Sequence, residues 1–321
     1  MKKDGFQALF PDPDPAVLAA RLRRPAGMAD VILDTDTYNE IDDQYALAYL
    51  VRSEEKLRVR AITAAPFYRD PSMGVCRSAD PADGMEKSYQ EILKVLSLMG
   101  REDLHSQVFR GAAGYLPSET EPVDSPAARA MVELSREYDW DRPLYLVAIG
   151  AITNVASALL LDPTLAERCV VIWLGGHGYH WGRCDDFNMI QDIAAARVVF
   201  GCGVPLVQFP CLGVVSEFRF SKPELEYWFR GKNSLCDYLI DNTYLYAAKK
   251  FSYEGWSKPL WDVTTVAWLL DGDYVMDRLV PSPIPQYDST YAFDANRHPI
   301  KYVYYVNKDP LAADLAKKLS R

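Results

Sequence analysis

The sequence predicts an α/β fold: an open, mostly parallel central sheet with helices on both faces, a Rossmann-like architecture. Strand and helix signals alternate along most of the chain, which is typical of parallel strands joined by crossover helices. The clearest predicted strands are apolar throughout, as expected for strands that are covered on both faces. Polar turns also follow several of these strands.

The alternation can be followed in order. A short apolar strand at 29–33 precedes a helix of good helix formers at 44–51. The pattern continues with strand 57–64, helix 85–99, strand 107–110, helix 127–138, strand 144–149, helix 154–161, strand 170–174, helix 193–200 and strand 205–209. Segment 221–270 is richer in helix, and a strand at 302–306 precedes a terminal helix at 311–319. The proline-rich segments 11–15 and 118–126 are predicted as loops too short for domain linkers, so we expect a single domain over 1–321.

Composition narrows the class of partner. The chain has 321 residues, 49% of them hydrophobic, and a net charge of -9, which allows a large core. An acidic balance without a Lys/Arg cluster argues against nucleic acid as a partner. No signal peptide is expected at residues 1–6 and no apolar run reaches membrane-spanning length, so no membrane partner is expected. Six scattered cysteines without a CxxC pair indicate reduced thiols of a cytoplasmic protein.

An acidic cluster lies between the first strand and its helix. Ten residues, 34–43, contain five carboxylates, and no Lys or Arg occurs between Arg24 and Arg52. Like charges this close resist joint ionisation unless they are neutralised, raised in pKa or bound to a metal ion. Helix capping could use Asp42 and Asp43, but not all five acids. The turn lies at the carboxyl end of a strand, where open α/β sheets bind ligands.

Three later segments also place polar groups after predicted strands. They are 147–154, 173–180 leading to 185–188, and 260–264. Parallel strands would bring these segments to the same sheet edge as the acids. Carboxylates and a turn carbonyl are the oxygen ligands that calcium or magnesium prefers.

These motifs resemble the inosine-uridine preferring nucleoside hydrolase family, in the family's order from about residue 29 to residue 270. The matching segments are Asp34-Thr35-Asp36, Ile41-Asp42-Asp43, Ala151-Ile152-Thr153-Asn154, Gly175-Gly176, Asp186-Phe187-Asn188 and Trp261-Asp262. The resemblance implies calcium-dependent hydrolysis of the N-glycosidic bond of ribonucleosides. It also implies a nucleoside as the small-molecule partner and a homodimer or homotetramer.

The resemblance implies roles for individual residues. Asp36, Asp43, Asp262 and the backbone carbonyl of Thr153 would bind the calcium ion, and Asp36 would also be the general base. Substrate-binding roles would fall on Asp42, which holds ribose hydroxyls, and on Asn188 and Asp186, which hold the sugar's other hydroxyls. The family usually has Glu at the position of Asp186. Dense negative charge beneath the sugar would stabilise an oxocarbenium-like state, and a metal lowers the pKa of its bound water.

The sequence also departs from the family pattern. The acidic turn is two residues longer, with 37–40 in place of Pro-Gly. The family's Asn after the second strand falls near Pro66 and Phe67, and a sugar-binding Asn falls on His180. Trp261 replaces the His that often protonates the leaving base. We expect His180 and Trp261 at the substrate, and Tyr38 and Phe67 as pocket walls or plain packing residues.

Alternatives to these assignments exist. Asp262 could cap the helix predicted at 263–270, and His177 is best interpreted as structural. A haloacid-dehalogenase-like phosphatase would use Asp34 as nucleophile with Asp273 and Asp277 as distal acids, although Tyr38 stands where that class has Thr or Val. A ribose-binding protein that retains the metal but has lost turnover is the other alternative.

Overall fold

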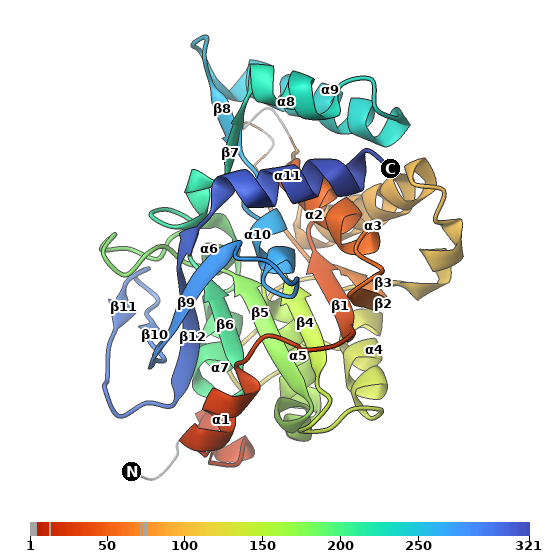
Figure 1. The fold of residues 1–321 in the computed structure, drawn as a ribbon. Helices are drawn as coiled ribbons and strands as arrows, with labels where there is room; N and C mark the ends of the chain where they lie inside the picture. Colours follow the sequence, from red (N-terminus) through yellow and green to blue (C-terminus); the bar gives the residue numbers. More distant parts are fainter. Residues whose placement is uncertain (1–4, 13, 71, 73–75) are drawn as a thin grey trace.

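The computed structural model describes residues 5–12, 14–70, 72 and 76–321 (Figure 1). Residues 1–4 of the amino-terminal segment and residue 13 of the first predicted loop lie outside the described residues. Within the described part of the chain, no helix is long and apolar enough to cross a membrane.

An eight-stranded sheet forms the centre of the molecule, in the order β3-β2-β1-β4-β5-β6-β12-β9 (Figure 1). Neighbouring strands pair in parallel, except for β12 with β9, which pair antiparallel. The strands are β1 (Ala29–Thr35), β2 (Leu57–Ala64), β3 (Val108–Arg110), β4 (Leu144–Ala148), β5 (Cys169–Leu174), β6 (Leu206–Phe209), β9 (Val275–Pro281) and β12 (Pro299–Val306). The predicted fold class is confirmed, with an antiparallel edge strand that the sequence did not predict.

Helices cover both faces of the sheet because its strands alternate their apolar side chains between two cores. Val31 and Leu33 pack in one core with α2, α3, α10 and α11, while Ile32 packs in the other with α4, α5 and α7. The helices are α1 (Pro15–Arg21), α2 (Asp42–Val51), α3 (Pro81–Leu98), α4 (Pro126–Ser135), α5 (Thr153–Leu161), α6 (Phe187–Gln191), α7 (Ile193–Gly201), α8 (Lys222–Phe229), α9 (Ser234–Lys250), α10 (Val263–Ala267) and α11 (Lys308–Leu319).

Two helices begin earlier than predicted, each at a proline that follows a capping residue. Helix α3 begins at Pro81, four residues before the predicted start, because Asp80 Oδ1 accepts a hydrogen bond from Asp83 N at 2.8 Å. Helix α4 begins at Pro126 after Ser125, whose hydroxyl accepts from Ala128 N at 3.1 Å. Proline fits the first helical turn because its missing N–H would be unpaired there anyway.

The strand order reverses between β1 and β4. The chain leaves β1 for α2 on one face and leaves β4 for α5 on the other, so a crevice opens at the carboxyl ends of these two strands. Beyond this edge lie α8, α9 and the antiparallel pair of β7 (Arg219–Ser221) with β8 (Ser257–Pro259) (Figure 1). A small hairpin joins β10 (Ile284–Pro285) to β11 (Tyr291–Ala292).

Candidate active site

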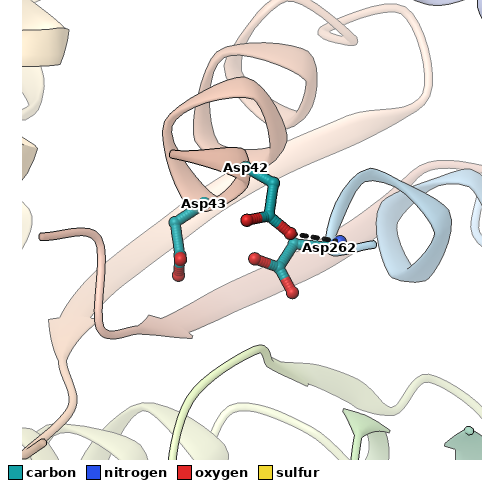
Figure 2. A group of neighbouring side chains, drawn as sticks. All are labelled: Asp42, Asp43 and Asp262. Carbon is teal, nitrogen blue, oxygen red and sulfur yellow. Dashed lines mark hydrogen bonds between the residues drawn. The ribbon is translucent and has the colours of Figure 1, made fainter. Parts of the chain in front are cut away.

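Acids from three separate segments meet at the crevice. Asp36 directly follows β1, Asp42 and Asp43 form the first turn of α2, and Asp262 directly precedes α10. Carboxylate oxygens of Asp42, Asp43 and Asp262 lie within 4.8 Å of one another, and all three residues are buried (Figure 2). A group of this spacing and chemistry could hold a hard cation.

None of these acids acts as a side-chain cap. The N-cap of α2 is Ile41, with no side-chain capping bond, and Asp262 at the N-cap of α10 makes none either. Instead, Asp42 Oδ2 accepts a hydrogen bond from the backbone N of Asp262 at 3.4 Å (Figure 2). The capping interpretation of Asp262 is therefore wrong.

The carboxylate of Asp36 lacks hydrogen bonds in the crevice. It is buried, and neither of its oxygens has a hydrogen-bond partner among the described residues. Burial and the neighbouring Asp43 raise its pKa well above the usual range. Burying a carboxylate without a partner costs free energy. A ligand that binds Asp36 would therefore stabilise the site.

Burial and neighbouring negative charges also raise the pKa values of Asp43 and Asp262. Burial and the charge of Asp42 raise the pKa of Asp43 to about 7, although Thr35 Oγ1 donates to its Oδ1 at 2.6 Å. Burial, followed by the charges of Asp42 and Asp43, raises the pKa of Asp262 well above its usual range. Together these acids form a negative floor that a cation would stabilise.

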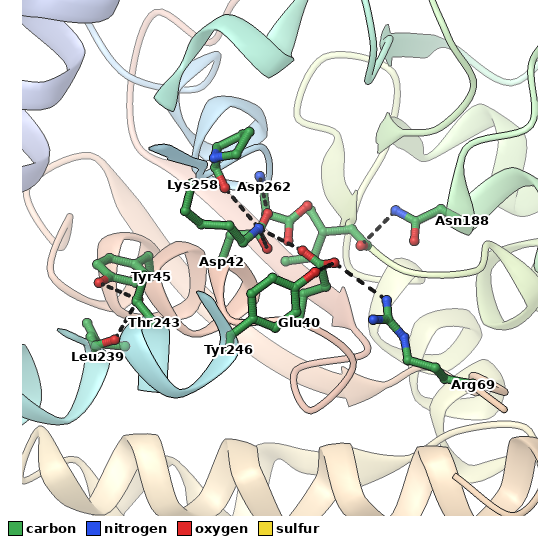
Figure 3. A network of polar contacts seen from close by, with 12 residues as sticks. Glu40, Asp42, Tyr45, Arg69, Asn188, Leu239, Thr243, Tyr246, Lys258 and Asp262 are labelled. Carbon is green, nitrogen blue, oxygen red and sulfur yellow. Dashed lines mark hydrogen bonds and ion pairs between the residues drawn. The ribbon is translucent and has the colours of Figure 1, made fainter. Parts of the chain in front are cut away.

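Two distant cations enter the same region. Lys258 in β8 donates from Nζ to Glu40 Oε2 at 2.6 Å and to Asp42 Oδ1 at 3.3 Å (Figure 3). Arg69, after β2, places Nη2 3.5 Å from Glu40 Oε1. Burial raises the pKa of Glu40, but the charges of Lys258 and Arg69 outweigh it and lower that pKa overall.

These two cations were missed from the sequence. The acidic cluster lacks a nearby cation, as the sequence indicates, but Glu40 and part of Asp42 are compensated through the fold. A possible signal was the isolated Lys258 in the aromatic segment 256–261. Its Nζ lies 3.8 Å from the ring centroid of Trp261.

Two asparagine amides join the strand ends next to the acids of the crevice. Asn154 Nδ2 donates to Asp34 Oδ1 at 2.8 Å and to Ala64 O at 3.1 Å, and its Oδ1 accepts from Ala112 N at 2.8 Å. Asn154 therefore joins β1, β2 and the turn after β3. The amide also explains why Asp34 is buried away from the acids at the crevice.

Asn188 plays the same part on the other side of the crevice. Its Nδ2 donates to Ile149 O after β4 at 2.9 Å and to Leu174 O at the end of β5 at 3.0 Å. Both amide hydrogens are thereby used, so the side-chain carbonyl oxygen is the atom that Asn188 can offer to a ligand.

Two further residues expected at the site make hydrogen bonds that fix the local fold. Asp186 caps α6, and its carboxylate accepts from the backbone N of Gly176, Asn188 and Met189. Burial raises the pKa of Asp186 to about 7. Thr153 Oγ1 donates to Asp192 Oδ2 at 2.7 Å, and Asp192, which the sequence did not single out, thus fixes the start of α5.

These acids and amides open into a cavity of about 310 Å³. Its walls include seven residues expected at the site: Asp36, Asp42, Asp43, Asp186, Asn188, Trp261 and Asp262. Glu40, Arg69, His177, Asp185 and Phe187 also line it. A cavity of this size, with a few convergent polar groups, suits a small-molecule ligand.

Four residues expected at the site do not line the cavity. His180 is exposed and is not among the cavity-lining residues, whereas the buried His177 lines the cavity. Phe67 is fully buried and Tyr38 is 37% exposed, and neither is among the residues lining the cavity. Thr153 is buried and is not among the residues lining the cavity.

The comparison with known proteins identifies the family. The profile of the inosine-uridine preferring nucleoside hydrolases matches residues 31–300. The chain belongs to this family. It is therefore a hydrolase acting on N-glycosyl compounds.

Relatives of this nucleoside hydrolase extend over most of its length. A pyrimidine-specific ribonucleoside hydrolase RihA from Enterobacter sp. (strain 638) is 28% identical over 270 residues, which are 75% of this chain and 78% of that protein. RihA from Klebsiella pneumoniae (strain 342) is 28% identical over 254 residues, 71% of this chain and 76% of that protein.

Solved structures share the fold. A plant nucleoside hydrolase, PpNRh1, superposes with a TM-score of 0.73 at 20% identity, over 91% of this chain and 99% of that one. A purine-preferring ribonucleoside hydrolase from Gardnerella vaginalis has a TM-score of 0.73 at 18% identity, over 91% and 98%.

Membership of the nucleoside hydrolase family argues against a haloacid-dehalogenase-like phosphatase. The fold also separates its acids, because Asp34 lies in β1 and Asp277 lies in β9, with four strands of the sheet between them. Asp277 accepts hydrogen bonds from Trp268 Nε1 at 2.9 Å and from Lys301 Nζ at 2.5 Å. These contacts give it a structural role at the sheet edge.

Proposed function

We propose that this nucleoside hydrolase cleaves the N-glycosidic bond of ribonucleosides in a calcium-dependent reaction, giving free base and ribose. The observation that carries the proposal is the buried carboxylate of Asp36, with two unpaired oxygens beside a cluster of further acids. The names of the relatives, which are ribonucleoside hydrolases, support the substrate class.

The donor set fits a calcium ion. Asp36, Asp43 and Asp262 would hold it, with the backbone carbonyl of Thr153 as a further oxygen ligand. Carboxylate and carbonyl oxygens are what calcium prefers, and the raised pKa values of these acids indicate a site short of positive charge. When bound, the ion supplies a positive charge that lowers the pKa of a coordinated water molecule.

The residues of the chain perform the remaining chemistry. Asp36 accepts the proton of the attacking water on a carboxylate oxygen, while that water's oxygen bonds to C1′ of the ribose. Asp42 and the side-chain oxygen of Asn188 orient the ribose hydroxyls, together with Asp186. The acidic floor stabilises the positive charge that develops on the sugar ring as the C1′–N bond breaks.

Release of ribose from uridine and inosine tests the proposal. We expect turnover in calcium, loss on chelation and recovery when calcium is returned. Turnover that is unaffected by exhaustive chelation would contradict the metal dependence. Absence of ribose release from every nucleoside tested would contradict the reaction.

A ribose-binding protein without efficient turnover is the second candidate, and one observation favours it. Trp261 lines the cavity where the family often has a His, and an indole cannot act as a general acid near neutral pH. Hydrolysis of p-nitrophenyl riboside separates the two, because its leaving group needs no protonation. Calcium-dependent ribose binding without cleavage of either substrate class would support the binding protein.

We further propose a cytoplasmic location and a homodimeric or homotetrameric assembly. All six cysteines are free thiols in the structure, which supports a reducing compartment. Sedimentation analysis of the purified chain would test the assembly, and a monomer at micromolar concentration would contradict it.

A further inference from the structure

The proposed reaction leaves negative charge on the departing base. As the C1′–N bond breaks, both of its electrons go to the base nitrogen, and this charge must be protonated or stabilised. Trp261 can stack on a base, and its indole N–H is unpaired among the described residues, but it has no acidic proton to transfer. A cation in the cavity would stabilise the negative charge more strongly.

Three basic residues lie in or beside the cavity, and two are unsuitable. Lys258 is 1% exposed and is not among the cavity-lining residues. Its Nζ is already engaged by Glu40, Asp42 and the carbonyl of Pro259. His177 accepts a hydrogen bond at Nδ1 from Leu212 N at 3.2 Å, and burial lowers its pKa. A neutral imidazole is a weak proton donor near pH 7.

Arg69 is the remaining cation. It lines the cavity, and its side chain is 10% exposed. Its guanidinium carbon lies 4.9 Å from the ring centroid of Phe187, which also lines the cavity. The planar guanidinium therefore lies beside the ring of Phe187. Its positive charge is opposite to that of the acids in the same cavity.

The hydrogen-bonding capacity of Arg69 is underused. Nε has no partner within the described part of the chain, and the contact from Nη2 to Glu40 Oε1 is 3.5 Å long (Figure 3). The guanidinium also interacts with the side chain of Tyr246. Glu40 is better satisfied by Lys258 Nζ at 2.6 Å and by Tyr246 OH at 2.5 Å. Arg69 can therefore turn N–H donors toward a ligand without leaving Glu40 unpaired.

We propose that Arg69 is the leaving-group electrophile of this enzyme: its guanidinium binds the departing base and stabilises the base anion. This inference rests on the proposed function. Water adds its oxygen to C1′ and gives its proton to Asp36, while the C1′–N electron pair leaves with the base. The base anion, held by Arg69, then takes a proton from solvent, and Asp36 returns its proton to solvent.

Arginine suits this role because it stays charged at every working pH and presents several donors in a plane. Carbonyl oxygens and ring nitrogens of a base accept hydrogen bonds from such a fork, as they do at the edge of guanine in DNA. Stabilising charge that appears only as the bond breaks accelerates the chemical step itself.

The test compares leaving groups in the calcium-loaded enzyme. Arg69→Met should lower kcat/KM for uridine and inosine by about 100-fold. The loss on p-nitrophenyl riboside should be at least ten times smaller, because its leaving group is stable as an anion. Arg69→Lys, which keeps the charge but not the planar fork, should lie between wild type and Arg69→Met on nucleosides.

Controls separate this role from folding and from the proposed function. Arg77→Met, an exposed arginine in the same connection, should keep wild-type rates on both substrate classes. Equal losses by Arg69→Met on nucleosides and p-nitrophenyl riboside, or no loss on nucleosides, would overturn the role of Arg69. Wild-type protein that cleaves neither substrate class would instead overturn the proposed function.

Discussion

Lys258 Nζ lies 2.6 Å from Glu40 Oε2, although the two residues are 218 positions apart. The bond joins β8, beyond the carboxyl edge of the sheet, to the turn between β1 and α2. Burial lowers the pKa of Lys258, but Asp42 and Glu40 raise it further, so the ammonium stays charged. This buried pair gives the acidic turn part of its counter-charge.

Replacing Lys258 should destabilise the fold. Lys258→Met leaves Glu40 and Asp42 without their buried cation, and we expect a loss of about 3–5 kcal/mol in the free energy of unfolding. Chemical denaturation measures it, with the exposed Lys249→Met as control. Adding Glu40→Gln should recover part of the loss. A Lys258→Met protein as stable as wild type would contradict a compensating role.

Asp36→Asn should lower the catalytic rate strongly without harming the fold. The amide keeps the shape of the carboxylate but cannot accept the proton of water, so we expect kcat to fall by about 10²–10⁴. The metal-free variant should be at least as stable as wild type, because an unpaired buried acid is removed. Ribose release and thermal unfolding measure the two effects, with the exposed Asp141→Asn as control. Retained turnover would exclude Asp36 as the base.

Asp34 should make the metal-free protein less stable as pH rises. Burial raises its pKa from 3.8 to about 7, so the folded state binds more protons than the unfolded state across that interval. Stability present at low pH is then lost as pH rises toward 7, by up to about 1.4 kcal/mol per pH unit for one group. The difference in unfolding free energy between wild type and Asp34→Asn, measured in chelator between pH 4 and 8, isolates this contribution. A difference independent of pH would contradict the buried titration.

Calcium should stabilise the folded protein through the acidic floor. At 100 times the dissociation constant we expect about 2.7 kcal/mol of stabilisation, visible as a rise in Tm. Asp262→Asn should weaken calcium binding, measured by isothermal titration calorimetry, whereas the exposed Asp141→Asn should not. Equal calcium affinity in wild type and Asp262→Asn would remove Asp262 from the site.

Local patterns predicted most of the sheet and the acids at its edge. Apolar strands followed by polar turns gave β1, β4 and β5 correctly, and parallel pairing then brings Asp36 and Asn188 to one edge. Strand β9 was not predicted, because at the sheet's edge its residues are mostly exposed or half-buried and show no clean alternation. Its place depends on pairing with β12, which local sequence does not encode.

The cations of the site could not be predicted for a related reason. Lys258 and Arg69 reach Glu40 only through tertiary packing, and no spacing in the sequence relates them. His177 and His180 could not be ranked either. Which of them lines the cavity depends on the backbone path after β5, and residue type does not encode that path.

The amides of Asn154 and Asn188 have a consequence for the kind of ion that the enzyme accepts. They hold the ends of β1, β2, β4 and β5 together on both sides of the crevice, so Asp36, at the end of β1, is held at a fixed position relative to the turn after β4. Part of the ligand spacing is therefore set by the sheet and not by the bound ion. We expect a cradle of fixed dimensions to discriminate by ionic radius, taking cations that match its span and leaving smaller, tightly hydrated ones in solution.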